Sequence, residues 1–160
     1  MKKILILLIL ASITFSCGTP KTVIQSKKVI KGNWTLEQIS FSQPGTYEVA
    51  LFNDVSKECF VGSIWRFIPN NNTGTYTINN TNCIPTGIRY FIFTIQQINA
   101  DTGLYDFLLK PTTAKGKSED NAGFRLQLTQ LTETTMRWEQ TVLLNGKPFT
   151  IYMNFTKTNK

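Results

Sequence analysis

From residue 32 onward, apolar and polar residues alternate in short runs that are separated by turn residues. Such period-two alternation is typical of β-strands with one buried face. Between the last two runs, Asn145-Gly146 is a strong signal for a hairpin with a type I′ turn. Eight runs can be counted, over residues 32–41, 62–69, 73–79, 88–99, 104–110, 123–131, 135–144 and 147–157. They predict an all-β fold, an eight-stranded up-and-down antiparallel β-barrel, with a two-sheet sandwich as the alternative.

The same alternation predicts which side chains face the barrel interior. In the run 135–144, for example, Met136, Trp138 and Val142 fall on the inward face. Eight strands enclose a space that side chains can fill or that can hold one small ligand, and the sequence leaves both open. If a ligand binds inside, the candidate contacts are the inward aromatic and methionine side chains Trp65, Phe67, Tyr76, Phe91, Phe93, Tyr105, Phe107, Met136, Trp138 and Phe149.

Helical patterns play a small part. The best candidate is a short helix over residues 53–60, where Asp54 is placed to cap the N-terminus. Residues 17–31 contain no aromatic residue and few core-forming ones, so we expect them to form a flexible tether ahead of the barrel domain, residues 32–160.

The N-terminal segment has a different pattern. Lys2 and Lys3 precede an uninterrupted apolar stretch, residues 4–11, and Cys17 follows a smaller, more polar stretch. The apolar stretch is too short to cross a bilayer, which takes about 20 residues, and the order is typical of a cleaved secretory signal.

The five residues ending at Cys17, ITFSC, resemble the lipobox of bacterial lipoproteins. The resemblance implies a signal peptide over residues 1–16 that is cut before Cys17, and acyl chains such as palmitate on that cysteine. It further implies a location in the bacterial cell envelope, lipid-anchored and facing the periplasm or the surface. Because Gly18 is not the Asp of inner-membrane retention, we expect the outer membrane. The alternative is an ordinary signal peptide with an unmodified Cys17.

Two more cysteines lie within the barrel region. If Cys17 carries lipid, Cys59 and Cys83 remain as a pair in an oxidising compartment, where we expect them to form a disulfide. The alternatives are two free thiols or a metal site. Because the chain has no histidine and no further cysteine pair, we expect no metal.

Charge and composition narrow the function. The chain carries a formal charge of +7, and its basic residues are scattered apart from Lys27-Lys28 and the loop 110–117. Without a basic stripe interleaved with aromatics, we expect no nucleic-acid partner, and an anionic membrane surface is the simpler account. The lack of histidine excludes Ser-His-Asp and Cys-His arrangements, and the alternation places Asp106 and Glu139 outside. We therefore expect neither an enzyme nor a cofactor.

The first strand carries a family signature. Gly32-Asn33-Trp34 resembles the G-x-W motif of lipocalins, and Cys59, Trp65-Arg66-Phe67, the turn 70–74 and Cys83 are similar to small bacterial lipocalin-like domains on lipoproteins. This resemblance covers residues 32–157. It implies that Gly32 and Trp34 close one end of the barrel, with Trp34 beneath an arginine from a late strand. Arg137 and Arg125 are the candidates for that arginine.

Together these features predict a membrane-anchored, monomeric lipocalin-like lipoprotein whose barrel binds a small hydrophobic or amphipathic ligand. The alternative is a non-catalytic envelope protein with a filled barrel, whose loops, such as residues 42–56 and 110–122, bind a protein partner.

Overall fold

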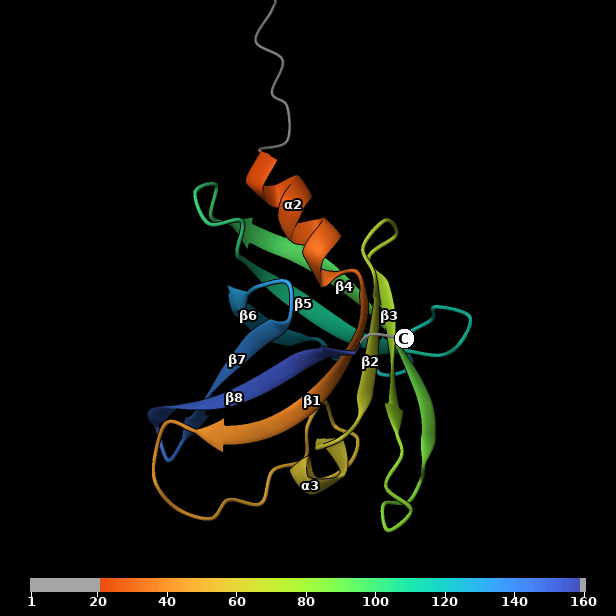
Figure 1. Cartoon of the computed structure of the whole chain (residues 1–160). Helices are drawn as coiled ribbons and strands as arrows, with labels where there is room; N and C mark the ends of the chain where they lie inside the picture. Colours follow the sequence, from red (N-terminus) through yellow and green to blue (C-terminus); the bar gives the residue numbers. More distant parts are fainter. Residues whose placement is uncertain (1–20, 159–160) are drawn as a thin grey trace, which may run out of the picture.

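The barrel is present in the structure, a computed structural model that describes residues 21–158. The predicted signal peptide and Cys17 lie outside the described residues. Eight strands form a closed barrel in which each strand pairs antiparallel with its neighbour in sequence, and β1 pairs with β8 (Figure 1). The strands are β1 (Gly32–Phe41), β2 (Ile64–Ile68), β3 (Thr73–Ile78), β4 (Gly87–Ile98), β5 (Tyr105–Thr112), β6 (Phe124–Leu131), β7 (Thr135–Leu144) and β8 (Lys147–Thr158). This order confirms the predicted up-and-down barrel.

The last hairpin shows how local sequence sets the register. Asn145 and Gly146 both have positive φ, as a type I′ turn requires, and they pair Leu144 with Lys147. Along β8 the alternate side chains Phe149, Ile151, Met153 and Phe155 are buried, in keeping with the period-two pattern of the run 147–157. Val142 was expected inside and is 39% exposed, because β7 continues past the rim of the barrel.

Aromatic rings fill the barrel interior. The Trp65 ring on β2 lies 5.3 Å from that of Trp138 on β7, and the Phe107 ring on β5 lies 5.0 Å from Trp138. Gly74 makes room for the Phe91 ring, since a Cβ at this position would lie 2.3 Å from it. Side chains from opposite walls therefore meet inside the barrel.

Residues predicted as a flexible tether form helix α2 (Lys21–Ile30), and this part of the tether prediction is wrong. Ser26, Val29 and Ile30 are buried against the barrel. The Trp34 indole Nε1 donates a hydrogen bond of 2.8 Å to the Ile30 carbonyl. Among the described residues, no helix has the length and apolar character needed to cross a membrane.

The predicted helix over residues 53–60 is correct only in its last turn, α3 (Lys57–Phe60). Ser56 occupies the N-cap position. Asp54 does not cap the helix, because its carboxylate binds Arg89 and Tyr76 instead.

The antiparallel order gives the barrel two ends (Figure 1). At one end, here the closed end, lie α2 and the turns 69–72, 99–104 and 132–134. At the other, here the mouth, lie the long loop 42–63 with α3, the loops 79–86 and 113–123, and the turn 145–146.

Candidate functional site

The closed end is sealed around Trp34, which is fully buried. The Lys157 ammonium lies 5.2 Å from the centre of the Trp34 ring and donates a hydrogen bond of 2.7 Å to the Val29 carbonyl. The cation over Trp34 is thus a lysine at the end of β8. The expectation of Arg137 or Arg125 is wrong, since Arg137 lies over the Tyr152 ring, 4.3 Å from its centre. Lys157 is the β8 residue that pairs with Trp34 on β1, so aligning these two strands would have identified the lysine.

The mouth is plugged by one side chain of the loop 42–63. The Phe52 ring contacts the rings of Phe60, Trp65, Tyr76 and Phe124 at centroid distances of 5.3–6.4 Å, and Phe52 is only 3% exposed. Phe52 and Asn53 have φ values of 55° and 56°, in the left-handed region. A bulky side chain rarely adopts this conformation, so surrounding contacts must hold it there.

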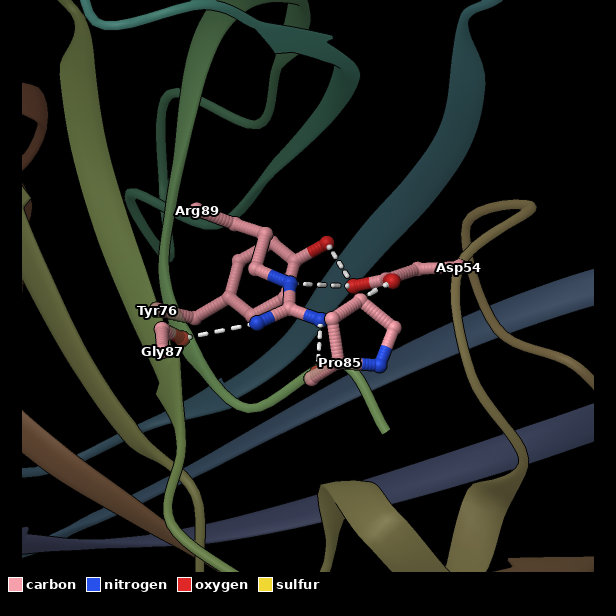
Figure 2. A network of polar contacts seen from close by, with 5 residues as sticks. All are labelled: Asp54, Tyr76, Pro85, Gly87 and Arg89. Atoms are coloured by element: carbon pink, nitrogen blue, oxygen red, sulfur yellow. Dashed lines mark hydrogen bonds and ion pairs between the residues drawn. The ribbon is translucent and has the colours of Figure 1, made fainter. Parts of the chain in front are cut away.

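A polar cluster provides such contacts. The Asp54 carboxylate accepts hydrogen bonds from the Tyr76 hydroxyl at 3.0 Å and from Arg89 Nε at 2.9 Å and Nη2 at 3.3 Å (Figure 2). Arg89 also donates to the carbonyls of Gly87 and Pro85. We call Asp54, Tyr76 and Arg89 the latch, because they fix the residue after Phe52–Asn53 to β3 and β4.

The surroundings of the Tyr76 hydroxyl keep it protonated. Burial raises the pKa of the Tyr76 hydroxyl well above its usual range, and the neighbouring Asp54 carboxylate raises it further. The hydroxyl therefore remains a donor to Asp54 at physiological pH.

A disulfide between Cys59 and Cys83 joins the loop 42–63 to the loop 79–86, with the Cα atoms 5.8 Å apart. The predicted pairing is confirmed. The mouth is thus held shut by a covalent bond as well as by the latch.

Two clefts flank the Phe52 plug. The apolar cleft has a volume of about 550 Å³ and lies between the loop 42–63 and strands β6–β8. The polar cleft, of about 430 Å³, lies beside the latch and the loop 113–123 and includes Glu119 and Asp120. Phe52 and Asn53 line both clefts. The apolar cleft is named for ten of its lining residues, Tyr47, Val49, Ala50, Phe52, Phe124, Val142, Leu143, Leu144, Phe149 and Ile151. Four polar residues, Thr46, Glu48, Asn53 and Gln140, line it as well.

The ten predicted ligand contacts are all buried, and the barrel brings them together. Of these ten, Phe149 lines the apolar cleft and Tyr76 lines the polar cleft. Most of the others pack against one another inside the barrel, as Trp65, Phe67 and Trp138 do.

Sequence reasoning missed the loop residues Tyr47, Val49 and Phe52. The local signal was the apolar run Val49-Ala50-Leu51-Phe52, two residues after Tyr47 in the loop.

The structure thus has a closed eight-stranded meander with a helix across one end. The tryptophan of the G-x-W motif, Trp34, lies beneath a cation. The fold is lipocalin-like. No known protein family and no curated protein matches the chain. Similar solved structures include bovine odorant-binding protein in complex with a selenium-containing odorant, with 14% identity over 84% of this chain and 73% of that chain and a TM-score of 0.46. Two further structures, of the bovine protein with its natural ligand and of the protein from nasal mucosa, each have 14% identity over 82% of this chain and 73% of theirs, with TM-scores of 0.44. The strand order itself, rather than these distant similarities, establishes the barrel.

Proposed function

We propose that the protein is a membrane-anchored lipoprotein that binds a small hydrophobic or amphipathic ligand at the barrel mouth, in the apolar cleft. The observation that carries the proposal is this cleft, whose volume of about 550 Å³ suits a small molecule. One of its walls, Phe52, is held in a strained conformation. A wall of that kind can move when a ligand replaces its ring contacts.

The neighbouring polar cleft favours an amphipathic ligand. Phe52 and Asn53 lie between the two clefts. A ligand with its apolar body in the apolar cleft would therefore bring its polar end group towards Asn53 and the polar cleft. A ligand of this kind would use both sides of the plug.

Binding is tested with the mature protein, by native mass spectrometry for a retained ligand and by fluorescence anisotropy with a dansyl-labelled fatty acid. Val142→Glu adds a carboxylate to the apolar cleft, which already contains Glu48, at a position that is 39% exposed and therefore tolerant of substitution. We expect it to weaken probe binding at least tenfold. Val61→Glu is the matched control, since Val61 is 44% exposed and does not line the cleft. If the wild-type protein retains no ligand and binds no probe, the ligand proposal is wrong.

The anchor is tested separately. Cys17→Ser removes the thiol that would carry the lipid, so we expect the protein to leave the membrane fraction. Unchanged membrane attachment would exclude lipidation at Cys17.

A second candidate function is an envelope interaction protein with a filled barrel. The interior aromatic contacts favour it, and so does Leu143, which is 75% exposed at the tip of the β7–β8 hairpin. A photo-crosslinking residue at position 143, in intact cells, would capture a discrete partner under this candidate. A protein that binds the fatty-acid probe and gives no crosslink favours the ligand carrier.

A further inference from the structure

We infer that the outward face of α2 is a second contact with the membrane, one that binds anionic phospholipid headgroups and turns the barrel mouth away from the bilayer. The inference rests on the proposed anchor at Cys17, and it adds a partner surface and an orientation that the anchor alone does not supply.

The outward face of α2 has the chemistry for this contact. Lys21, Ile24 and Lys28 are exposed, and their spacing of three, four and seven residues places them on one side of the helix. Gln25, also exposed, lies at the edge of this face and lines a cleft between α2 and the β4–β5 turn. The helix contains no acidic residue. Ile24, 45% exposed among lysines, is the apolar element that basic interfacial helices insert between headgroups.

Charge is distributed unevenly between the two ends of the barrel. At the closed end, α2, Lys31 and Lys157 supply five lysines, while the turns there contribute two acids, Asp101 and Glu133. The mouth, residues 42–63, 79–86, 113–123 and 145–147, holds five acidic residues and four lysines. An anionic surface would therefore attract the closed end much more strongly than the mouth.

Because α2 is fixed to the barrel, it can orient the domain. The Thr22 hydroxyl donates a hydrogen bond of 2.5 Å to the Ala100 carbonyl in the β4–β5 turn. In the same turn Gly103 has a φ of 70°, and a Cβ there would lie 2.6 Å from the Thr22 carbonyl oxygen. The helix and the turn approach so closely that α2 and the barrel move as one body.

The length of chain between the anchor and the helix keeps this face near the lipid. Three residues, 18–20, separate Cys17 from Lys21. At no more than about 3.6 Å per residue, the four steps from Cys17 to Lys21 span at most about 14 Å. This reach is comparable with the screening length of about 8–10 Å at physiological salt. Each basic residue near such a surface strengthens binding by about fivefold.

The test measures how well lipid protects α2. Mature protein purified from membranes, carrying either Gln25→Cys on α2 or Ala114→Cys at the mouth, is bound to vesicles and labelled with a water-soluble maleimide. The native Cys59 and Cys83 are paired and do not react. One vesicle preparation is phosphatidylcholine alone, and the other is two parts phosphatidylcholine to one part phosphatidylglycerol. We expect labelling at position 25 to be at least tenfold slower on the anionic vesicles and to recover in high salt, while position 114 labels equally on both.

Charge variants identify the responsible face. Replacing Lys21, Lys28 and Lys31 by Gln is expected to abolish the difference at position 25. The matched triple Lys115→Gln, Lys117→Gln and Lys147→Gln removes the same charge from exposed mouth positions and is expected to preserve it. Equal labelling of position 25 on both vesicles, or equal effects of the two triples, overturns the inference. Flotation with the neutral vesicles reports on the Cys17 anchor alone, so failure of the anchor is scored independently.

Discussion

The two ends of the barrel are closed by different means. At the closed end, Trp34, Ile30 and Val29 bury one another, and the Trp34 indole and the Lys157 ammonium donate hydrogen bonds to the last carbonyls of α2. At the mouth, a long loop lays one ring, Phe52, over the core. That loop is then held by a disulfide and by the ion pair between Asp54 and Arg89.

The difference shows where burial of apolar surface is enough to close the barrel and where cross-links are needed as well. The seal around Trp34 is made by buried apolar area, and Val29, Ile30 and Trp34 all have a negative φ, which suits a permanent seal. The plug of the mouth is a residue in a strained left-handed conformation with an open cleft on either side, so it needs cross-links to stay in place. Removing one contact should therefore lower the free energy of unfolding most at the closed end. At the mouth, stability should depend mainly on the disulfide and on the Asp54–Arg89 ion pair.

The largest effect is expected at Trp34. Trp34→Ala leaves a cavity beneath α2 and should lower the free energy of unfolding by about 3–5 kcal/mol. Trp34→Phe, which keeps most of the ring and loses the hydrogen bond to Ile30, should cost clearly less. Urea unfolding followed by circular dichroism measures both. A loss for Trp34→Ala no larger than that for Trp34→Phe would show that the seal does not depend on this burial.

Removing the disulfide is expected to come second. Replacing Cys59 and Cys83 by Ala should lower the free energy of unfolding by about 3 kcal/mol, because the unfolded chain regains the freedom of the closed loop. Since the bond lies at the mouth, the variant should also bind the fatty-acid probe faster, whereas Trp34→Phe should leave the association rate unchanged. Thermal unfolding and stopped-flow fluorescence are the measurements. An unchanged melting temperature would contradict this role.

The same contrast explains what the sequence could predict. The strands were found almost residue for residue, because alternation is a local pattern and the register of the last hairpin follows from Asn145-Gly146. The α2 helix was missed because what stabilises it lies elsewhere in the chain. The Trp34 indole donates a hydrogen bond to the Ile30 carbonyl in the last turn of the helix, and Gly103 leaves room for Thr22 to approach the β4–β5 turn.

The mouth was harder to predict for a related reason. The residues next to Asp54 in the sequence predict a helix cap there. Its actual partners, Tyr76 and Arg89, are 22 and 35 residues away. Nothing in the alternation of the strands indicates which loop residue will enter the barrel, so Phe52 could not be found. The Cys59–Cys83 pair was predictable because these are the two cysteines that remain when Cys17 is assigned to the predicted lipid anchor.

A smaller effect is expected from the latch. Asp54→Asn removes the charge that pairs with Arg89, whose side chain is 17% exposed against 19% for Asp54. The loss of stability should be about 1–2 kcal/mol, between the values for exposed and buried pairs. Glu139→Gln is the matched control, because it breaks the more exposed contact with Arg137 and should cost less than about 0.5 kcal/mol. Equal costs in chemical denaturation would mean that the latch is no more than a surface ion pair.

The smallest effect concerns the strain in the plug itself. Glycine normally destabilises a folded chain relative to alanine, because its backbone loses more freedom on folding. At Phe52 the order should reverse, with Phe52→Gly about 1 kcal/mol more stable than Phe52→Ala, since alanine still suffers the left-handed backbone that glycine adopts freely. Leu51 is the control, because it is equally buried with a negative φ, and there alanine should be the more stable replacement. If glycine is worse than alanine at both positions, Phe52 is not strained, and the mouth is sealed by burial just as the closed end is.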